Sequence, residues 1–329
     1  MDYGFSIVKL TENKWNVSLL KMRRSLIFLL LPIFFLSGIF IFGDTASFND
    51  KATPKVYLNH FFLIIDSSTY KDIVESDFIK NDFAHFEERI TIVNNDESYT
   101  GAYVYGNNTY FEFFDKSNSQ GFMPPGLTSG MAFGVEKKDE INFIQKKLKA
   151  YKNAIIALRT RELDGIQIPW FAMSAVFYGN TAPDIMTWVM EYHEDFLKEW
   201  HPDLDPSSPG IARNHILKRY AANITKPDLP KAKIFKDVIE VNLKLNPKDI
   251  EVLKGELSVF AYTFSKEGNK EICTGPDVKI IIDSIDSGVG KITGIKMSTH
   301  HTRDKEVSFP FGNNSLLIIH TDNTATWKF

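Results

Sequence analysis

Apolar and polar positions along the chain follow one order of elements that recurs three times. Each recurrence starts with an apolar, β-branched or aromatic run that suits a strand, and continues with a segment of helical periodicity. Further strand-like runs follow, and a Gly-Asn turn signal precedes the last of them. Because a recurring order of elements indicates repeated structural units, the pattern predicts an α+β fold of three βαβββ units.

The first unit opens with the run 56–65, whose continuous apolar character suits a strand covered on both faces. Asp66 follows this run and is expected to cap a helix at 69–86. Three more strands are expected at 90–93, 100–105 and 109–114. The unit is therefore expected to close with the aromatic run TYFEFF.

The second unit repeats this order. A strand is expected at 130–135, and the segment 138–151 is predicted to be an amphipathic helix because Ile141, Ile144 and Leu148 recur at helical spacing. Strands are then expected at 154–159, 170–177 and 186–193. The last of these reads MTWVMEYH and closes the unit.

The third unit begins with a strand at 238–245, after which Asn246 can cap a helix and Pro247 fits its first position. Strands are expected at 278–282, 292–298 and 315–320. Ahead of this unit, the Pro-, Asp- and Ser-rich stretch 201–232 is typical of a linker or long surface loop, with a short helix at 211–222. We therefore expect a linker between a domain at 55–200 and a C-terminal unit at 233–329.

An apolar segment near the N-terminus indicates export. Residues 26–42 carry no charge, and Lys21, Arg23 and Arg24 stand directly before them. A basic flank followed by an apolar run is typical of a signal peptide or a signal anchor, whereas the alternative is a buried core helix. We expect residues 1–46 to form this targeting segment, with the remainder periplasmic, extracellular or membrane-anchored and facing outward.

Composition narrows the classes of function. The net charge of −3 and the pI near 6.3 give no electrostatic reason to expect a nucleic-acid partner. The hydrophobic content of 43% supports a large core. Cys273 is the one cysteine of the chain, so the exported part would fold without an internal disulfide.

Three short segments resemble the vicinal oxygen chelate superfamily, which includes glyoxalase I, extradiol dioxygenases and bleomycin-resistance proteins. The resemblance lies in LNHFFLIID at 58–66, YFEFFD at 110–115 and WVMEYHED at 188–195. More specifically, units one and two resemble an uncharacterised glyoxalase-like family of exported bacterial proteins. The resemblance implies that these two units pair into one domain around a metal, whose ligands come from the first and last strands of each unit.

Carried over residue by residue, the resemblance implies a metal site of His60, Glu112 and Glu191. The fourth family position falls near Met131, which is no usual ligand, and His193 could take its place. Imidazole and carboxylate donors suit a divalent ion such as Zn, Mn, Fe or Ni. The resemblance also implies that Glu112 or Glu191 shuttles a proton. The pocket would be lined by four residues on the ligand side of these strands: Tyr110, Phe114, Val189 and His193.

The residues themselves give a partly independent reason to single out the two glutamates. Both stand among apolar neighbours, and a buried carboxylate needs a cation, a partner or a raised pKa. The alternative is that each points outward from a half-exposed strand. The third unit has Glu240 at the position of His60, with Ile318 and His320 on its last strand. A Glu240–His320 site is conceivable, but a structural or dimer-forming role is favoured.

These observations leave three functional hypotheses. The first is a metal-dependent lyase, isomerase or dioxygenase acting on a small oxygenated molecule, with the ion as Lewis acid. The second is a metal-free protein that binds a small molecule, as the bleomycin-resistance resemblance implies. The third is an envelope protein that uses the fold only for association, and a homodimer is compatible with each.

Overall fold

In a computed structural model of the chain, the described residues are 53–94, 97–119, 123–151, 154–163, 165–176, 184–200, 212–224 and 232–329. All of them belong to one compact unit, Phe35–Phe329. The predicted targeting segment at 1–46 lies outside the described residues. Within the described part of the chain, no helix is both long enough and apolar enough to cross a membrane.

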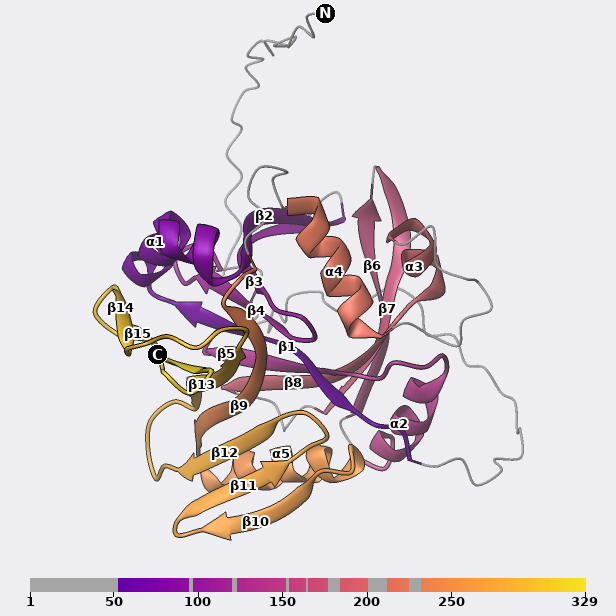
Figure 1. The fold of residues 1–329 in the computed structure, drawn as a ribbon. Helices are drawn as coiled ribbons and strands as arrows, with labels where there is room; N and C mark the ends of the chain where they lie inside the picture. The colour runs from indigo at the N-terminus through magenta and orange to yellow at the C-terminus, as the bar shows by residue number, and fades with distance from the viewer. Residues whose placement is uncertain are drawn as a thin grey trace, which may run out of the picture. The chain divides into compact units, whose positions relative to one another are not determined.

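The first sheet consists of eight strands from two βαβββ units (Figure 1). Unit one comprises β1 (Tyr57–Ile65), α1 (Ser67–Glu75), a π-helical turn (Ile79–Phe83), β2 (His85–Asn94), β3 (Glu97–Tyr105) and β4 (Tyr110–Asp115). Unit two comprises β5 (Ser129–Gly134), α2 (Glu140–Leu148), β6 (Ala154–Leu163), β7 (Ile166–Val176) and β8 (Ile185–Tyr192). The strand order is β2-β3-β4-β1-β5-β8-β7-β6, so the opening strands of both units meet at the centre. The expected pairing of units one and two is therefore present.

Local sequence explains where α1 begins and ends. Asp66 caps it as expected, because its carboxylate accepts a hydrogen bond from the Thr69 backbone N–H at 3.0 Å. The helix is shorter than the predicted 69–86, because Ser76 adopts extended backbone and ends it. The chain then makes its π-helical turn and enters β2 at His85.

The second sheet repeats the strand order of the first. Unit three comprises β9 (Phe235–Leu245), α5 (Pro247–Val259), β10 (Thr263–Glu267), β11 (Lys270–Thr274) and β12 (Lys279–Ser284). The remaining strands are β13 (Lys291–Thr299), β14 (Val307–Phe311), β15 (Ser315–Ile319) and β16 (Thr324–Lys328). The order is β10-β11-β12-β9-β13-β16-β15-β14, which makes β13–β16 a fourth unit where the sequence pattern indicated three.

The fourth unit differs from the others because no helix separates β13 from β14. In the first three units the opening strand pairs in parallel with the closing strand, which requires a crossover connection. Without that crossover, β13 pairs with β16 in the antiparallel sense. The missing helix also explains why sequence periodicity merged the third and fourth units.

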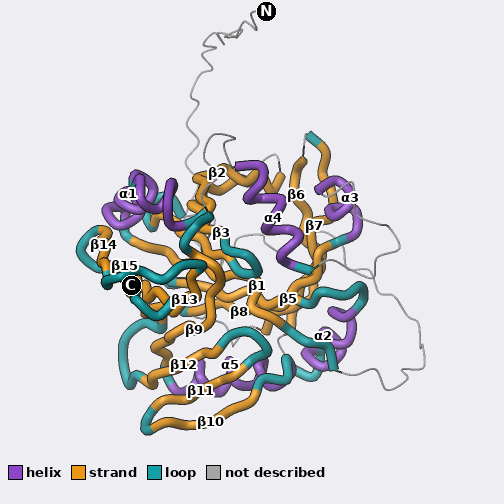
Figure 2. Tube along the Cα trace, viewed as in Figure 1, coloured by secondary structure: helices purple, strands orange, loops and turns teal. Residues whose placement is uncertain are grey.

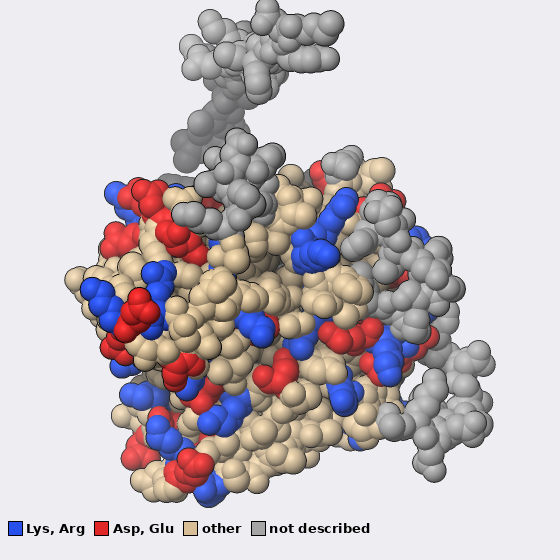
Figure 3. All heavy atoms as spheres, viewed as in Figure 1, with Lys and Arg blue, Asp and Glu red and all other residues tan. Residues whose placement is uncertain are grey.

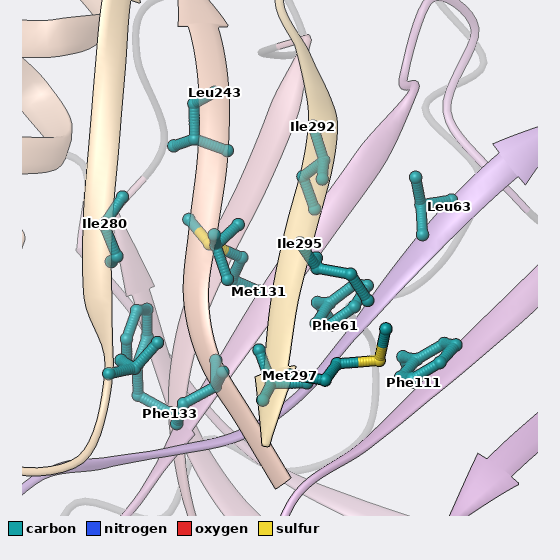
Figure 4. Close-up of a cluster of buried hydrophobic side chains, with 14 of the residues drawn as sticks. Phe61, Leu63, Phe111, Met131, Phe133, Leu243, Ile280, Ile292, Ile295 and Met297 are labelled. Carbon is teal, nitrogen blue, oxygen red and sulfur yellow. The ribbon is translucent and has the colours of Figure 1, made fainter. Parts of the chain in front are cut away.

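The two sheets pack against each other through apolar inner faces (Figure 4). The first sheet contributes Phe61, Leu63, Phe111, Met131 and Phe133, and the second contributes Leu243, Ile280, Ile292, Ile295 and Met297. Trp327 of β16 is fully buried in this core, where its ring lies 5.6 Å from that of Phe111 and 5.2 Å from that of Phe113. Since side chains alternate along a strand, the residues between these core positions point to the two outer faces.

A buried carboxyl also joins the two sheets. Glu256 of α5 is 1% exposed and accepts a hydrogen bond from the Val176 backbone N–H at 3.1 Å and another from the Thr187 hydroxyl. Burial raises the pKa of Glu256 to about 8, which the two hydrogen bonds partly oppose. The neutral acid is therefore the form that this interface favours near neutral pH.

Two helices cover the outer face of the first sheet (Figure 2). Helix α3 (Glu194–Trp200) packs on β7, and α4 (Arg213–Ile224) packs on β2 and β3. The short helix expected at 211–222 corresponds to α4. Arg213 anchors it, because its guanidinium contacts the carboxylates of Glu136 and Asp277 and donates to the Leu58 carbonyl.

Charged side chains are mixed over the surface. On the face drawn in Figure 3, Lys and Arg lie interspersed with Asp and Glu among the described residues. The described residues include exposed ion pairs, such as Lys138 with Glu194 at 3.2 Å. Such exposed pairs contribute little to stability, so the fold rests mainly on its apolar core.

Candidate functional site

The outer face of the first sheet brings together two of the residues predicted for a site. Strand β1 pairs in parallel with β4, which places Tyr110 beside His60 and Glu112 beside Phe62. The His60 Nε2 and Glu112 Oε1 atoms lie 3.9 Å apart. The two residues are only 8% and 7% exposed, so this polar pair is almost excluded from water.

Burial sets the protonation of both groups. It raises the pKa of Glu112 to about 7, against the opposing effects of the Arg89 charge and the Tyr110 hydroxyl. Burial also lowers the pKa of His60 to about 3, so the imidazole stays neutral. His60 Nδ1 lies 2.9 Å from the Asn59 side-chain oxygen, which can only accept a hydrogen bond. The proton therefore sits on Nδ1, and the lone pair of Nε2 faces Glu112.

Aromatic rings surround this pair. The Tyr110 ring stacks on His60 at 4.5 Å, and Trp188 meets His60 edge-on at 5.4 Å. Tyr99 and Tyr103 lie close enough for the charge of Glu112 to raise the pKa of each phenol, although burial is the larger cause. The neighbouring apolar cluster includes Phe62, Phe114, Ala132, Trp188 and Met190. Tyr110 and Phe114 thus lie on the same face of the sheet as His60 and Glu112.

Side chains of α3 and α4 form a second aromatic layer that covers this face. Tyr220 of α4 stacks on Tyr105 at 5.1 Å and contacts Trp200 of α3 at 4.3 Å. The Arg161 Nη1 group donates a hydrogen bond to the Tyr220 hydroxyl at 3.2 Å. Three donors of this layer are buried without a hydrogen-bond partner in the described structure, namely Arg161 Nε, Trp170 Nε1 and Trp200 Nε1.

The expectation that Glu191 joins this site is wrong in geometry. Its carboxylate lies on the other side of the sheet, where it accepts hydrogen bonds from the Asp139 and Ile141 backbone N–H groups at 2.8 and 2.9 Å. These donors belong to the first turn of α2, so Glu191 caps that helix. Val189 shares this direction and is fully buried in the inner core. Neither residue can line a pocket with His60.

His193 also lies away from the pair. It follows the end of β8, where its backbone N–H donates to the Trp170 carbonyl at 2.9 Å. Its Nδ1 atom accepts a hydrogen bond from the Asp195 backbone N–H at 3.2 Å. These contacts hold the start of α3 and leave His193 outside the site.

Other residues of β8 take the place expected for Val189, Glu191 and His193, and the sequence analysis missed them. Ala132 lies beside His60 on one side and Trp188 on the other, which places Trp188, Met190 and Tyr192 on the face of His60. The ring of Tyr192 continues the face toward the second aromatic layer, where it stacks on Phe196 at 5.5 Å. The alternating large side chains of β8 were the available signal, because they match Tyr110 and Phe114 on β4.

The described residues do not fit the implied metal. His60 and Glu112 are the two donors of the predicted set that converge, and Ala132 fills the position beside them on β5. Across the described ranges, no group of three or more His, Cys, Asp or Glu side chains is arranged to hold a metal ion. A protein-held divalent ion ordinarily has at least three such ligands. The donors that converge among the described residues are therefore too few to hold a divalent ion.

The corresponding positions of the second sheet are separate from each other. Glu240 pairs with Lys279 at 3.0 Å, whereas His320 contacts Glu306 at 2.7 Å. Both residues are half-buried on the outer face of that sheet. The conceivable Glu240–His320 pair is thus not formed.

A cavity of about 430 Å³ lies away from the polar pair, at the end of β1. Its lining includes Leu63, Ile65, Asp66, Lys291, Asn314 and Phe329. The Asp66 carboxylate there is already occupied as the cap of α1. The cavity holds neither His60 nor Glu112, so the candidate site is defined by the buried polar pair and not by this hollow.

Comparison with known proteins gives a family without an assigned activity. The model of a family of unknown function (DUF5829) matches residues 58–329, so the chain belongs to this family. No curated protein matches the chain.

Several solved structures are similar to the chain at low identity. A hypothetical protein from Staphylococcus aureus is 12% identical, with 78% of this chain and 95% of that chain covered and a TM-score of 0.45. An extradiol ring-cleaving dioxygenase from B. fuscum is 11% identical, with coverages of 84% and 73% and a TM-score of 0.40. Homoprotocatechuate 2,3-dioxygenase from Arthrobacter globiformis is 10% identical, with coverages of 84% and 80% and a TM-score of 0.37. At these values the similarities carry no inference about the activity of this chain.

Proposed function

We propose that this member of the DUF5829 family binds a small oxygenated aromatic molecule on the outer face of its first sheet, without a protein-held metal. The observation that carries the proposal is the buried His60–Glu112 pair enclosed by aromatic rings. Ligand sites are typically clefts lined by apolar and aromatic side chains with a few convergent polar groups. The face of His60 and Glu112 has this composition.

The polar groups of the face specify the kind of ligand. Below its pKa of about 7, the Glu112 carboxyl can donate a hydrogen bond to a ligand oxygen, while His60 Nε2 can accept one from a hydroxyl. The unpaired donors of Arg161, Trp170 and Trp200 would gain partners from further ligand oxygens. Flat rings would stack between the aromatic side chains.

A proton-transfer enzyme of isomerase or lyase type is a second candidate. It is favoured by the pKa of Glu112, because a general acid or base works best when its pKa lies near the working pH. In this reading Glu112 moves a proton to or from a substrate carbon. The metal-dependent alternative, including a dioxygenase-type reaction, would need donors beyond the two that converge here.

The proposal is tested by thermal-shift and fluorescence titration of the purified full-length chain with a panel of hydroxylated and carboxylated aromatic compounds. We expect at least one compound to raise the melting temperature, because a ligand that binds the folded state stabilises it. Glu112→Gln and His60→Phe should each lower the affinity for that compound about tenfold or more, as expected for a lost buried hydrogen bond. The matched control Glu240→Gln, on the outer face of the second sheet, should bind as the parent does.

Binding that is unchanged in Glu112→Gln and His60→Phe, or no binding across the panel, would contradict the proposal. The two candidate functions are separated by deuterium exchange, followed by NMR, at carbon positions of any compound that binds. Exchange that requires Glu112 supports the enzyme, whereas binding without exchange supports a binding protein.

We also propose that the chain is exported through the apolar segment at 26–42. The support is the charge pattern of the sequence alone. Cell fractionation and the mass of the mature N-terminus would test it, and a cytoplasmic, full-length product would contradict it.

A further inference from the structure

The outer face of the second sheet holds a chain of hydrogen bonds that joins a hydroxyl, an imidazole and a carboxylate. His320 Nε2 lies 2.9 Å from the Thr326 hydroxyl oxygen, and His320 Nδ1 lies 2.7 Å from Glu306 Oε2. The three residues come from β16, the end of β15 and the loop before β14. Strand pairing places Thr326 beside Ile318, two residues before His320, so the pairing of β15 with β16 fixes the arrangement.

The chemistry of these groups fixes the direction of each hydrogen bond. An ionised carboxylate can only accept, so His320 Nδ1 donates its proton to Glu306. In the neutral form of the imidazole, Nε2 then carries a lone pair, and the Thr326 hydroxyl donates to it. The oxygen of Thr326 thus keeps its own lone pairs free, and the base that would take its proton is already in contact.

The surroundings suit a reaction at this hydroxyl. Lys296 of β13 lies directly opposite Thr326 on the neighbouring strand, so the two residues share the outer face of the sheet. Ile318 and Leu316 of β15 are half-buried, and both alternate with core positions so that they share the face of Thr326. The His320 side chain is 28% exposed, so a small molecule can reach it.

We propose that Thr326, His320 and Glu306 form a nucleophilic site for acyl transfer from a small carboxylic ester. The Thr326 oxygen forms a bond to the ester carbonyl carbon while its proton passes to His320 Nε2. The imidazolium is stabilised by Glu306, and Lys296 shares the face of the sheet on which the oxyanion develops. The bond from carbon to the alcohol oxygen then breaks, and the alcohol leaves with the proton from Nε2.

Water completes the cycle. It attacks the acyl-threonine carbonyl and gives a proton to His320 Nε2, which returns that proton to the Thr326 oxygen as the acid is released. The balance is one ester and one water converted to one acid and one alcohol. This site shares no residue with the His60–Glu112 pair, so the inference stands or falls independently of the proposed ligand binding.

The experiment is covalent labelling of the full chain with a fluorophosphonate, which a nucleophilic hydroxyl attacks with loss of fluoride. Peptide mass mapping should place the label on Thr326. Thr326→Val, which keeps the shape of the side chain, should abolish the label, and Thr326→Ser should retain it. His320→Asn should slow labelling and the hydrolysis of 4-nitrophenyl acetate by about 100-fold, the usual contribution of a general base.

His301→Asn is the matched control, because His301 is an exposed histidine in the same loop as Glu306 and takes no part in the relay. It should be labelled at the rate of the parent. A parent chain that takes up no label, a label on another residue, or labelling unaffected by His320→Asn in a folded variant would overturn the proposal.

Discussion

The two sheets share one strand order, yet their outer faces differ in burial, in the elements that cover them and in the partners of their polar groups. The first sheet buries His60 and Glu112 beneath aromatic rings and two helices. The second presents Glu240, Lys279 and His320 half-buried and paired with polar neighbours. The inner faces, by contrast, are mainly apolar and enclose a few buried polar groups such as Glu256 and Thr187.

The difference shows that the helices covering a sheet, and not its strand order, set the chemistry of its outer face. Helices α3 and α4 exclude water from the first sheet, so burial dominates the pKa values of His60 and Glu112. On the second sheet, charges remain close to solvent and are held by partners. The same strand order thus supports a buried acid on one side and a solvent-accessible relay on the other.

The largest expected effect tests the core that both faces share. Trp327→Ala should destabilise the fold by about 3–5 kcal/mol, because it empties a fully buried position against Phe111 and Phe113. Urea unfolding followed by circular dichroism measures the change. Ile318→Ala, on the half-buried outer face, serves as the control and should cost well under half as much. Equal losses would mean that the two faces are not distinguished by burial.

The next effect distinguishes the buried acid of the first sheet. The pKa of Glu112 is raised in the folded protein from 4.5 to about 7, so the folded state holds the proton more tightly. Its contribution to stability is full below about pH 4.5 and is lost as the pH rises through about 7. Since glutamine does not titrate, Glu112→Gln should gain stability relative to the parent between about pH 5 and pH 8, by up to about 3 kcal/mol.

Unfolding free energies of the parent and Glu112→Gln at a series of pH values provide the measurement. Glu256 remains in both proteins, so its own titration cancels in the difference. A difference that does not change with pH would show that Glu112 is not buried as described.

A smaller effect separates the two sides of β8. Glu191→Ala should lower stability by about 1 kcal/mol, the usual cost of a lost cap at a helix N-terminus. It should leave ligand affinity at the first sheet unchanged, because its carboxylate binds the backbone of α2 on the inner side. Thermal melts and the titrations described above check both parts. A loss of ligand affinity without a loss of stability would mean that Glu191 belongs to the ligand site after all.

The smallest effect concerns the polar face of the second sheet. Glu240→Gln removes the partner of Lys279, whose side chain is 44% exposed. Pairs of this kind contribute about 0–1 kcal/mol, so the variant should unfold at nearly the urea concentration of the parent. A loss as large as that of Trp327→Ala would mean that this face is covered in solution, for example by a second copy of the chain.

Much of the fold could be predicted from the sequence, because apolar runs and capping residues act locally. The apolar run at 56–65 corresponds to β1. The predicted caps Asp66 and Asn246 each stand directly before an observed helix. The fourth unit could not be predicted in this way, since it lacks the helix whose periodicity marks the others. Its strands β14 and β16 are only five residues each and carry weak patterns.

Part of the candidate site could be predicted as well. The prediction for the residues of β8 failed for one physical reason. His60 and Glu112 lie on parallel neighbouring strands whose relation follows from the βαβββ order. Glu191 was aligned with Glu112 by matching WVMEYHED to YFEFFD, but a shift of one residue turns every side chain of a strand to the other face. Strand β8 is largely buried on both sides, so no alternation of polar and apolar residues reveals its register.

The absent helix of the fourth unit has a consequence for how the protein folds. Strands β14, β15 and β16 each pair with their neighbour in sequence, whereas a parallel unit must close a long loop before its first and last strands meet. Contacts between residues near in sequence form faster than distant ones. We therefore expect this three-stranded meander to order early and to offer β13 an edge on which to dock.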